Sequence, residues 1–134
     1  MAREVINPKS LYTSIEYGFS HATKSSGKCI IHCAGQVAWN KEHEVVGPND
    51  LATQTRQVLS NLRTALTEAG ATPADIVRMR TYVVNHKPEY LKIVGPEIAK
   101  FYGEVTPAAN TFIGVQSLAL PDFLIELEAT AQIE

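Results

Sequence analysis

The chain has 134 residues, of which 45% are hydrophobic and 19% are charged, and this size and balance are typical of one globular domain. The formal net charge of -2 gives no electrostatic reason to expect a nucleic acid, and there is no run of basic residues to bind an anionic membrane. No apolar stretch reaches the roughly 20 residues needed to span a bilayer.

The cysteines and the N-terminal residues predict the cellular compartment. Residues 1–6 contain no apolar core, so we expect no secretory signal. Cys29 and Cys33 fall in one predicted strand, about 13 Å apart, which is too far for a disulfide. Free thiols without a secretory signal predict a cytoplasmic protein.

The first third of the chain predicts three strands. The first covers residues 4–6 and the second residues 18–23, and a turn at residues 25–28 follows. Residues 29–38 then form an almost continuous apolar run. Such a run is typical of a strand that is covered on both faces.

The middle of the chain predicts a helix and another strand. Asn49 or Asp50 is a suitable N-cap, and Gly70 is a suitable residue to end the helix. Between them, apolar residues recur every three or four positions, which predicts one buried helix face. Residues 76–85 alternate and are rich in branched side chains, which predicts a strand.

The last third predicts a second helix and two more strands. The helix covers residues 87–102 and is interrupted at Gly95-Pro96, where Pro96 is suited to begin its second part. The strands cover residues 110–118 and 124–133. This order predicts an open sheet with two helices on one face, and association of subunits would then cover the other face.

Short motifs occur in a fixed order along essentially the whole chain. They are Gly18-Phe19-Ser20-His21-Ala22, Ala34-Gly35-Gln36, Gln54 to Leu62, Ala69-Gly70-Ala71, Asp75 to Met79, Pro107-Ala108, and Ile125 to Ala129. Together they resemble the motifs of the reactive-intermediate deaminase (Rid, or YjgF) family. The resemblance implies one α+β domain over residues 1–134 with a chorismate-mutase-like fold. It also implies a homotrimer with a barrel-like core and small-molecule clefts between its subunits.

The chain departs from that family at one position. The family's deaminases carry an arginine after Pro-Ala that grips the substrate carboxylate. Here Pro107-Ala108 is followed by Ala109 and Asn110, so either Asn110 or Ala109 takes the arginine's place. Residues 101–134 contain no lysine or arginine. The departure favours a neutral substrate, a cationic iminium, or one whose acid group is held by a basic residue from elsewhere.

Glu126 is the predicted catalytic residue. Strand alternation places it on one face with Glu128, Thr130 and Gln132. By resemblance, it corresponds to the glutamate that holds the water attacking a C=N carbon, and imine hydrolysis needs such a group to move protons. The alternative is a polar strand face that is hydrogen-bonded to a neighbouring subunit.

The resemblance also implies five residues that bind the substrate. They are Phe19, His21, Ala34, Gly35 and Asn110. Asn110 offers hydrogen bonds where the arginine would lie, but it cannot neutralise a carboxylate. Its alternative role is to cap its own turn at the strand entry.

No metal or cofactor is expected. Alternation sends Cys29 and Cys33 to one strand face and His32 to the other, so the three cannot share an ion. Two carboxylates on one strand, Glu126 and Glu128, also suit a glycosidase, but no other feature of the sequence indicates a sugar site. The chain contains no Walker sequence and no G-x-G-x-x-G motif for a nucleotide.

The leading hypothesis is therefore a cofactor-free enzyme that hydrolyses a small imine or enamine in clefts between subunits. An aminomuconate-like enamine is a more attractive substrate than the common 2-imino acids, because the arginine that grips those acids is missing. Two alternatives stay open. One is a trimer that binds a metabolite without catalysis, and the other is a different hydrolase that uses the same cleft.

Overall fold

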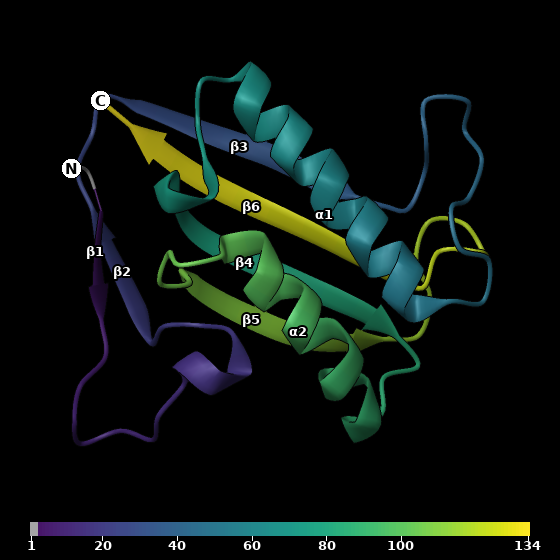
Figure 1. Ribbon diagram of the computed structural model, residues 1–134, viewed down its shortest axis with the longest axis horizontal. Helices are drawn as coiled ribbons and strands as arrows, with labels where there is room; N and C mark the ends of the chain where they lie inside the picture. The colour runs from purple at the N-terminus through teal and green to yellow at the C-terminus, as the bar shows by residue number, and fades with distance from the viewer. Residues whose placement is uncertain (1–2) are drawn as a thin grey trace.

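The computed structural model describes residues 3–134, and Figure 1 shows its elements along the chain. There are six strands, two α-helices and three short 3₁₀ turns in this part of the chain. The elements are β1 (Arg3–Ile6), η1 (Ile15–Tyr17), β2 (Ala22–Ser25), β3 (Cys29–Gln36), α1 (Leu51–Glu68), η2 (Pro73–Asp75), β4 (Ile76–Val84), η3 (Pro88–Tyr90), α2 (Leu91–Tyr102), β5 (Ala109–Val115) and β6 (Ile125–Ile133).

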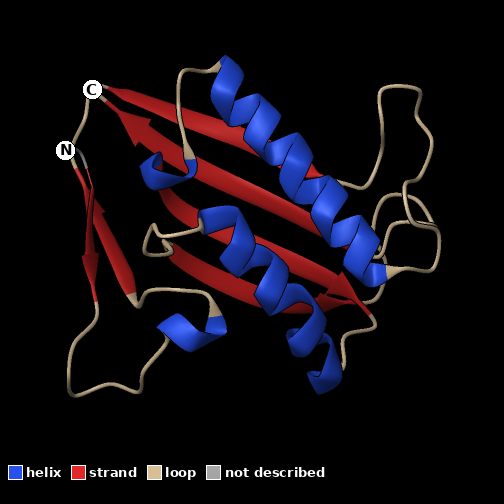
Figure 2. Cartoon of the chain, viewed as in Figure 1, coloured by secondary structure: helices blue, strands red, loops and turns tan. Residues whose placement is uncertain are grey.

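Four strands form the main sheet, in the order β3-β6-β4-β5. β4 and β5 run parallel, and the other neighbouring strands run antiparallel. Both helices lie on one face of this sheet, with α1 over β3 and β6 and α2 over β4 and β5 (Figures 1 and 2). The prediction of an α+β fold with two helices on one face of a mixed sheet is therefore confirmed.

The core lies between the helices and the sheet. On β6, residues 125, 127, 129 and 131 are buried under the helices, while the residues between them are only partly buried on the opposite face. α1 contributes Val58, Leu62 and Leu66, none of which is exposed to solvent. We call the sheet face away from the helices the outer face.

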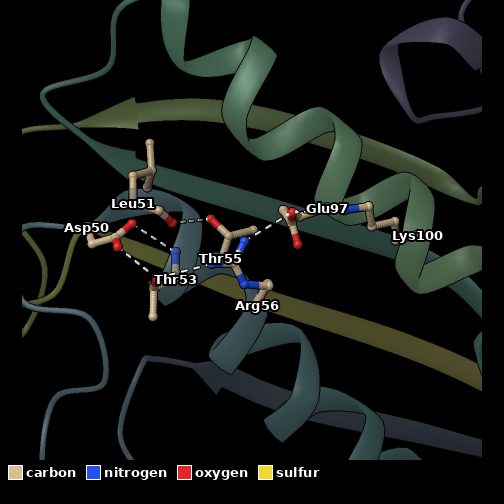
Figure 3. Close-up of polar contacts among 7 residues, drawn as sticks. All are labelled: Asp50, Leu51, Thr53, Thr55, Arg56, Glu97 and Lys100. Atoms are coloured by element: carbon tan, nitrogen blue, oxygen red, sulfur yellow. Dashed lines mark hydrogen bonds and ion pairs between the residues drawn. The ribbon is translucent and has the colours of Figure 1, made fainter.

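Capping and an ion pair fix the helix layer. The Asp50 carboxylate accepts a hydrogen bond from the Thr53 backbone N–H at 3.0 Å, so Asp50 is the N-cap of α1. Arg56 on α1 meets Glu97 on α2 at 3.3 Å, and Lys100 meets the same carboxylate at 3.6 Å. Figure 3 shows these contacts, of which the Arg56–Glu97 pair joins α1 to α2.

A second, two-stranded sheet of β1 and β2 lies beside the main sheet. The Ser20 backbone N–H donates to the Ala108 carbonyl at 3.0 Å, and Ser20 forms an isolated parallel bridge with Ala109. The segment before β2 therefore lies against the start of β5. Within residues 3–134, no helix combines the length and hydropathy needed to cross a membrane.

Several predicted boundaries were wrong. The second strand begins at Ala22 and not at residue 18, because Gly18 has a φ of +86° and ends the turn η1. α2 runs through Pro96 without a break, after a separate turn η3. The third strand is not covered on both faces in the single chain, since it is an edge strand whose Ile30 is 58% exposed.

Candidate functional site

The outer face carries the side chains of the predicted catalytic strand. On β6, Glu126, Glu128, Thr130 and Gln132 all lie on it, as the alternation predicts, and each is partly buried. In the antiparallel pairing with β4, Glu126 lies opposite Tyr82 and Glu128 lies opposite Arg80. The outer face is therefore a polar surface with carboxylates, a phenol and guanidinium groups on adjacent strands.

Gly35 and Glu126 are in direct contact. The pairing of β3 with β6 is irregular between Cys33 and Gln36, so β3 bulges where it passes the start of β6. A Cβ on Gly35 would lie 1.9 Å from Oε2 of Glu126 and 2.7 Å from its Cδ. Only glycine leaves room for the carboxylate here, so the bulge and the missing side chain together hold Glu126 against the β3 backbone.

Glu126 and its neighbour Glu128 differ in their partners. Glu128 accepts a hydrogen bond from the Tyr82 hydroxyl at 2.5 Å and lies 3.8 Å from the Arg80 guanidinium. Glu126 has no hydrogen-bond or ion-pair partner within residues 3–134. Glu128 is thus held by the protein, while Glu126 keeps its oxygens available for a ligand or water.

The surroundings of Glu126 change its proton affinity. Partial burial raises the pKa of its carboxyl above the ordinary value, and the charge of Glu128 raises it further. A carboxyl with a raised pKa holds and releases protons closer to neutral pH. This property suits a general acid and base.

The predicted residues Phe19 and His21 lie near β5, the edge strand at the opposite end of the sheet from β3. The residue between them, Ser20, is hydrogen-bonded to Pro107 and Ala108. Their rings are 5.8 Å apart, and His21 also packs against Tyr12 at 4.6 Å. The His21 Nε2–H donates to the Tyr12 carbonyl oxygen at 2.7 Å. The segment is therefore an ordered aromatic cluster beside the start of β5.

The structure places Asn110 and Ala109 on opposite faces of β5. The Thr81 hydroxyl donates to Oδ1 of Asn110 at 3.3 Å, and both Thr81 and the register partner of Asn110, Met79, are fully buried. Asn110 therefore lies on the helix side. Ala109 lies on the outer face with Glu126.

The predicted site residues form two groups that are separated in one chain. Ala34 and Gly35 lie on the bulged part of β3, where Gly35 contacts Glu126 of β6. Phe19 and His21 flank Ser20, which bridges Ala109. Through β4, Ala109 is level with Arg78 and Thr130. Thr130 is four residues, or about 13 Å, along β6 from Glu126. One chain alone does not bring all predicted residues together around a small molecule.

Three residues of the outer face were not predicted from the sequence as part of the site. They lie on β4 and are Arg78, Arg80 and Tyr82. The alternation of the predicted strand does place them on one face, opposite Met79, Thr81 and Val83. What the sequence did not show is that β4 is paired with β6, which places these three beside the glutamates.

The cysteines lie as the alternation predicts. Cys33 packs against the core on the helix side, and burial raises the pKa of its thiol. His32 is exposed on the opposite side of the strand. Residues 3–134 contain no group of three or more histidine, cysteine or acidic side chains placed to hold a metal ion.

Known proteins match the chain over almost its whole length. Residues 12–133 match the model of the family described as Endoribonuclease L-PSP. A RutC family protein of Pyrococcus abyssi is 32% identical over 135 residues, covering 100% of both chains. The crystal structure of the Rid family protein YyfB from Yersinia pestis is 56% identical, with a TM-score of 0.97 over 99% of this chain and 100% of that one. A member of the YjgF/YER057c/UK114 family from Mycobacterium tuberculosis is 30% identical, with a TM-score of 0.65 over 98% and 100% of the two chains.

Proposed function

Because this chain belongs to the Endoribonuclease L-PSP family, together with the Rid and YjgF proteins, we propose that it hydrolyses a small imine or enamine without a cofactor. Glu126 is the general acid and base in this reaction. Ribonuclease activity, which the family description names, is not part of the proposal, because a net charge of -2 offers no counterpart to the phosphates of RNA.

The position of Glu126 carries this proposal. Its carboxylate lies against the Gly35 backbone, partly buried and with no partner within residues 3–134, while Glu128 next to it is bound by Tyr82 and Arg80. A carboxylate left unpaired in a partly buried position costs free energy, so its presence needs an explanation, and a catalytic role supplies one. We therefore assign the catalytic role to Glu126 and a structural role to Glu128.

The reaction needs only water and proton transfers. Glu126 accepts a proton from a water molecule as the water oxygen bonds to the C=N carbon, and the C=N electron pair moves to nitrogen. Glu126 then returns the proton to nitrogen. In the carbinolamine, Glu126 takes the hydroxyl proton and passes it to the amino group, so that the C–N bond breaks, ammonia leaves and the oxygen forms the carbonyl group. An enamine enters the same path after its carbon is protonated to give the imine.

The site is shared by two copies of the chain in this proposal. Glu126 with Gly35 forms one half-site, and the outer face around Ala109 with Phe19 and His21 forms the other. Since the two lie about 13 Å apart along the strands of one chain, a second copy supplies the missing half. The trimer that the family resemblance implies provides such an arrangement.

The test is the turnover of imines generated in situ from amino acids by an amino-acid oxidase. The Glu126→Gln variant should lower kcat by about 10²- to 10⁴-fold, which is the usual contribution of a general acid or base. Glu68→Gln, at the exposed end of α1, removes a carboxylate far from the site and should leave kcat unchanged. If Glu126→Gln is as active as the parent, Glu126 is not catalytic. If no imine is turned over but one binds, the protein is a binding protein and the enzyme proposal is wrong.

A further inference from the structure

The outer face has a shallow cavity that Glu126 does not line, and the proposed reaction gives it no role. It lies between β4 and β6 and is lined by Arg78, Met79, Arg80, Glu128, Ala129 and Thr130. Two guanidinium groups and one carboxylate therefore surround it, with a threonine hydroxyl at one side. The cavity thus has a net positive charge.

The two arginines of this cavity differ in their pairing. Arg80 lies 3.8 Å from Glu128, whose same oxygen also accepts the Tyr82 hydroxyl at 2.5 Å. Arg78 is exposed and forms no hydrogen bond or ion pair with any side chain in residues 3–134. Its guanidinium therefore retains a full set of donors, which suit the planar, two-oxygen geometry of a carboxylate.

The register of the strands places Arg78 beside Ala109, at the start of the strand on which the family's deaminases carry their arginine. Arg78 on β4 is the direct pairing partner of Ala109 on β5, and both lie on the outer face. The methyl group of Ala109 leaves the surface next to Arg78 open. The β5 sequence supplies no positive charge to this half-site. Arg78 supplies one from β4, the neighbouring strand, which lies about 4.8 Å from β5.

We propose that Arg78 binds a carboxylate of the substrate in this cavity, with the Thr130 hydroxyl at its edge. This inference rests on the proposed function, since it names the substrate class of the same shared site. Because the charge lies one strand away from Ala109, the carboxylate that it holds is shifted relative to the reacting carbon. The substrate class is therefore an imine with a second, distal carboxylate, and short monocarboxylic imino acids are poor substrates.

The kinetic test compares 2-iminoglutarate with 2-iminopropionate, each generated in situ by an amino-acid oxidase. The parent protein should prefer the dicarboxylate in kcat/KM. Arg78→Gln should raise KM for 2-iminoglutarate by about 10- to 100-fold with little change in kcat, because a bidentate charged hydrogen bond is lost. Arg78→Lys should restore part of that loss, since it keeps the charge but not the fork of donors. Lys92→Gln, which removes an exposed positive charge on α2, is the matched control and should change nothing.

A binding experiment separates this inference from the proposed function. Glutarate, which cannot react, is titrated calorimetrically into the parent protein, Glu126→Gln and Arg78→Gln. The inference predicts that glutarate binds the first two and binds Arg78→Gln at least tenfold more weakly. Equal binding to all three, or a KM unaffected by Arg78→Gln, would overturn the inference and leave the role of Glu126 standing. Arg78-dependent binding together with full activity of Glu126→Gln would instead overturn the proposed function and leave the carboxylate site standing.

Discussion

At the scale of single residues, the contact between Gly35 and Glu126 determines where the proposed catalytic carboxylate lies. In the Gly35→Ala variant, the new methyl group would overlap Oε2 of Glu126, so the carboxylate must swing away. We expect kcat to fall by about 10²-fold, because a misplacement of about 1 Å has that effect on catalysis. The free energy of unfolding should change by less than about 1 kcal/mol, since only the end of a flexible side chain moves. Steady-state kinetics and urea unfolding check the two expectations, and Gly95→Ala, with no atom in contact, is the control for both.

The raised pKa of Glu126 predicts a pH dependence of stability. The pKa of this carboxyl is higher in the folded chain than its ordinary value of 4.5. Between these two pKa values, the folded state therefore binds more protons than the unfolded state does. The charged form is therefore disfavoured in the folded state, and its contribution lowers stability as pH rises through the folded pKa. Glu126→Gln cannot ionise, so its advantage in unfolding free energy should be larger at pH 7 than at pH 4. Urea unfolding at both pH values measures this, and a difference that is constant or shrinks with rising pH would contradict the assigned burial of Glu126.

At the scale of elements, Gln54 of α1 fixes the loop that leads into β6. Its side chain donates to the carbonyl oxygens of Gly47 at 3.1 Å and Asp122 at 2.9 Å, and it accepts from the Leu124 N–H at 2.9 Å. Gln54 is fully buried. Gln54→Leu fills similar space but leaves these three groups unpaired, and it should lower the free energy of unfolding by about 2–4 kcal/mol. Urea unfolding tests this against Ser60→Leu, an exposed position of the same helix where a change below about 0.5 kcal/mol is expected.

Pattern alone predicts the elements that have one buried and one exposed face. α1 and β6 show regular periods because each packs one face on the core, and their predicted extents agree with the structure to within a residue or two. β2 was misplaced because Gly18 ends an unpredicted turn, η1, and the strand begins only at Ala22. For β5, the predicted start at Asn110 omitted Ala109, which lies on the outer face, whereas Asn110 lies on the helix side. Which strands pair is not a local property, and for that reason Arg78 and Tyr82 were missed.

At the scale of the whole molecule, the outer face and the edge strand β3 are open in one chain. Ile30 lies on the outer face of β3 and is 58% exposed, and Ile113 on β5 is 38% exposed. Exposed apolar residues on an unpaired edge predict a covering partner, and we propose that this partner is another copy of the chain. We expect a mass three times the 14.7 kDa of one chain by light scattering. Ile30→Arg should dissociate the assembly without unfolding it, and Leu91→Arg, 44% exposed on α2, should not.

The most direct test of a site shared by two copies is complementation between two inactive chains. Glu126→Gln removes the first half-site, and Ala109→Tyr fills the second half-site on the outer face. Each variant alone should lack imine turnover while it keeps the mass of the parent assembly. When both are co-expressed, mixed assemblies contain junctions that join an intact Glu126 to an intact Ala109 surface, and turnover should return. Mixed assemblies of native mass that stay inactive would show that no such junction forms a site, and they would contradict the account.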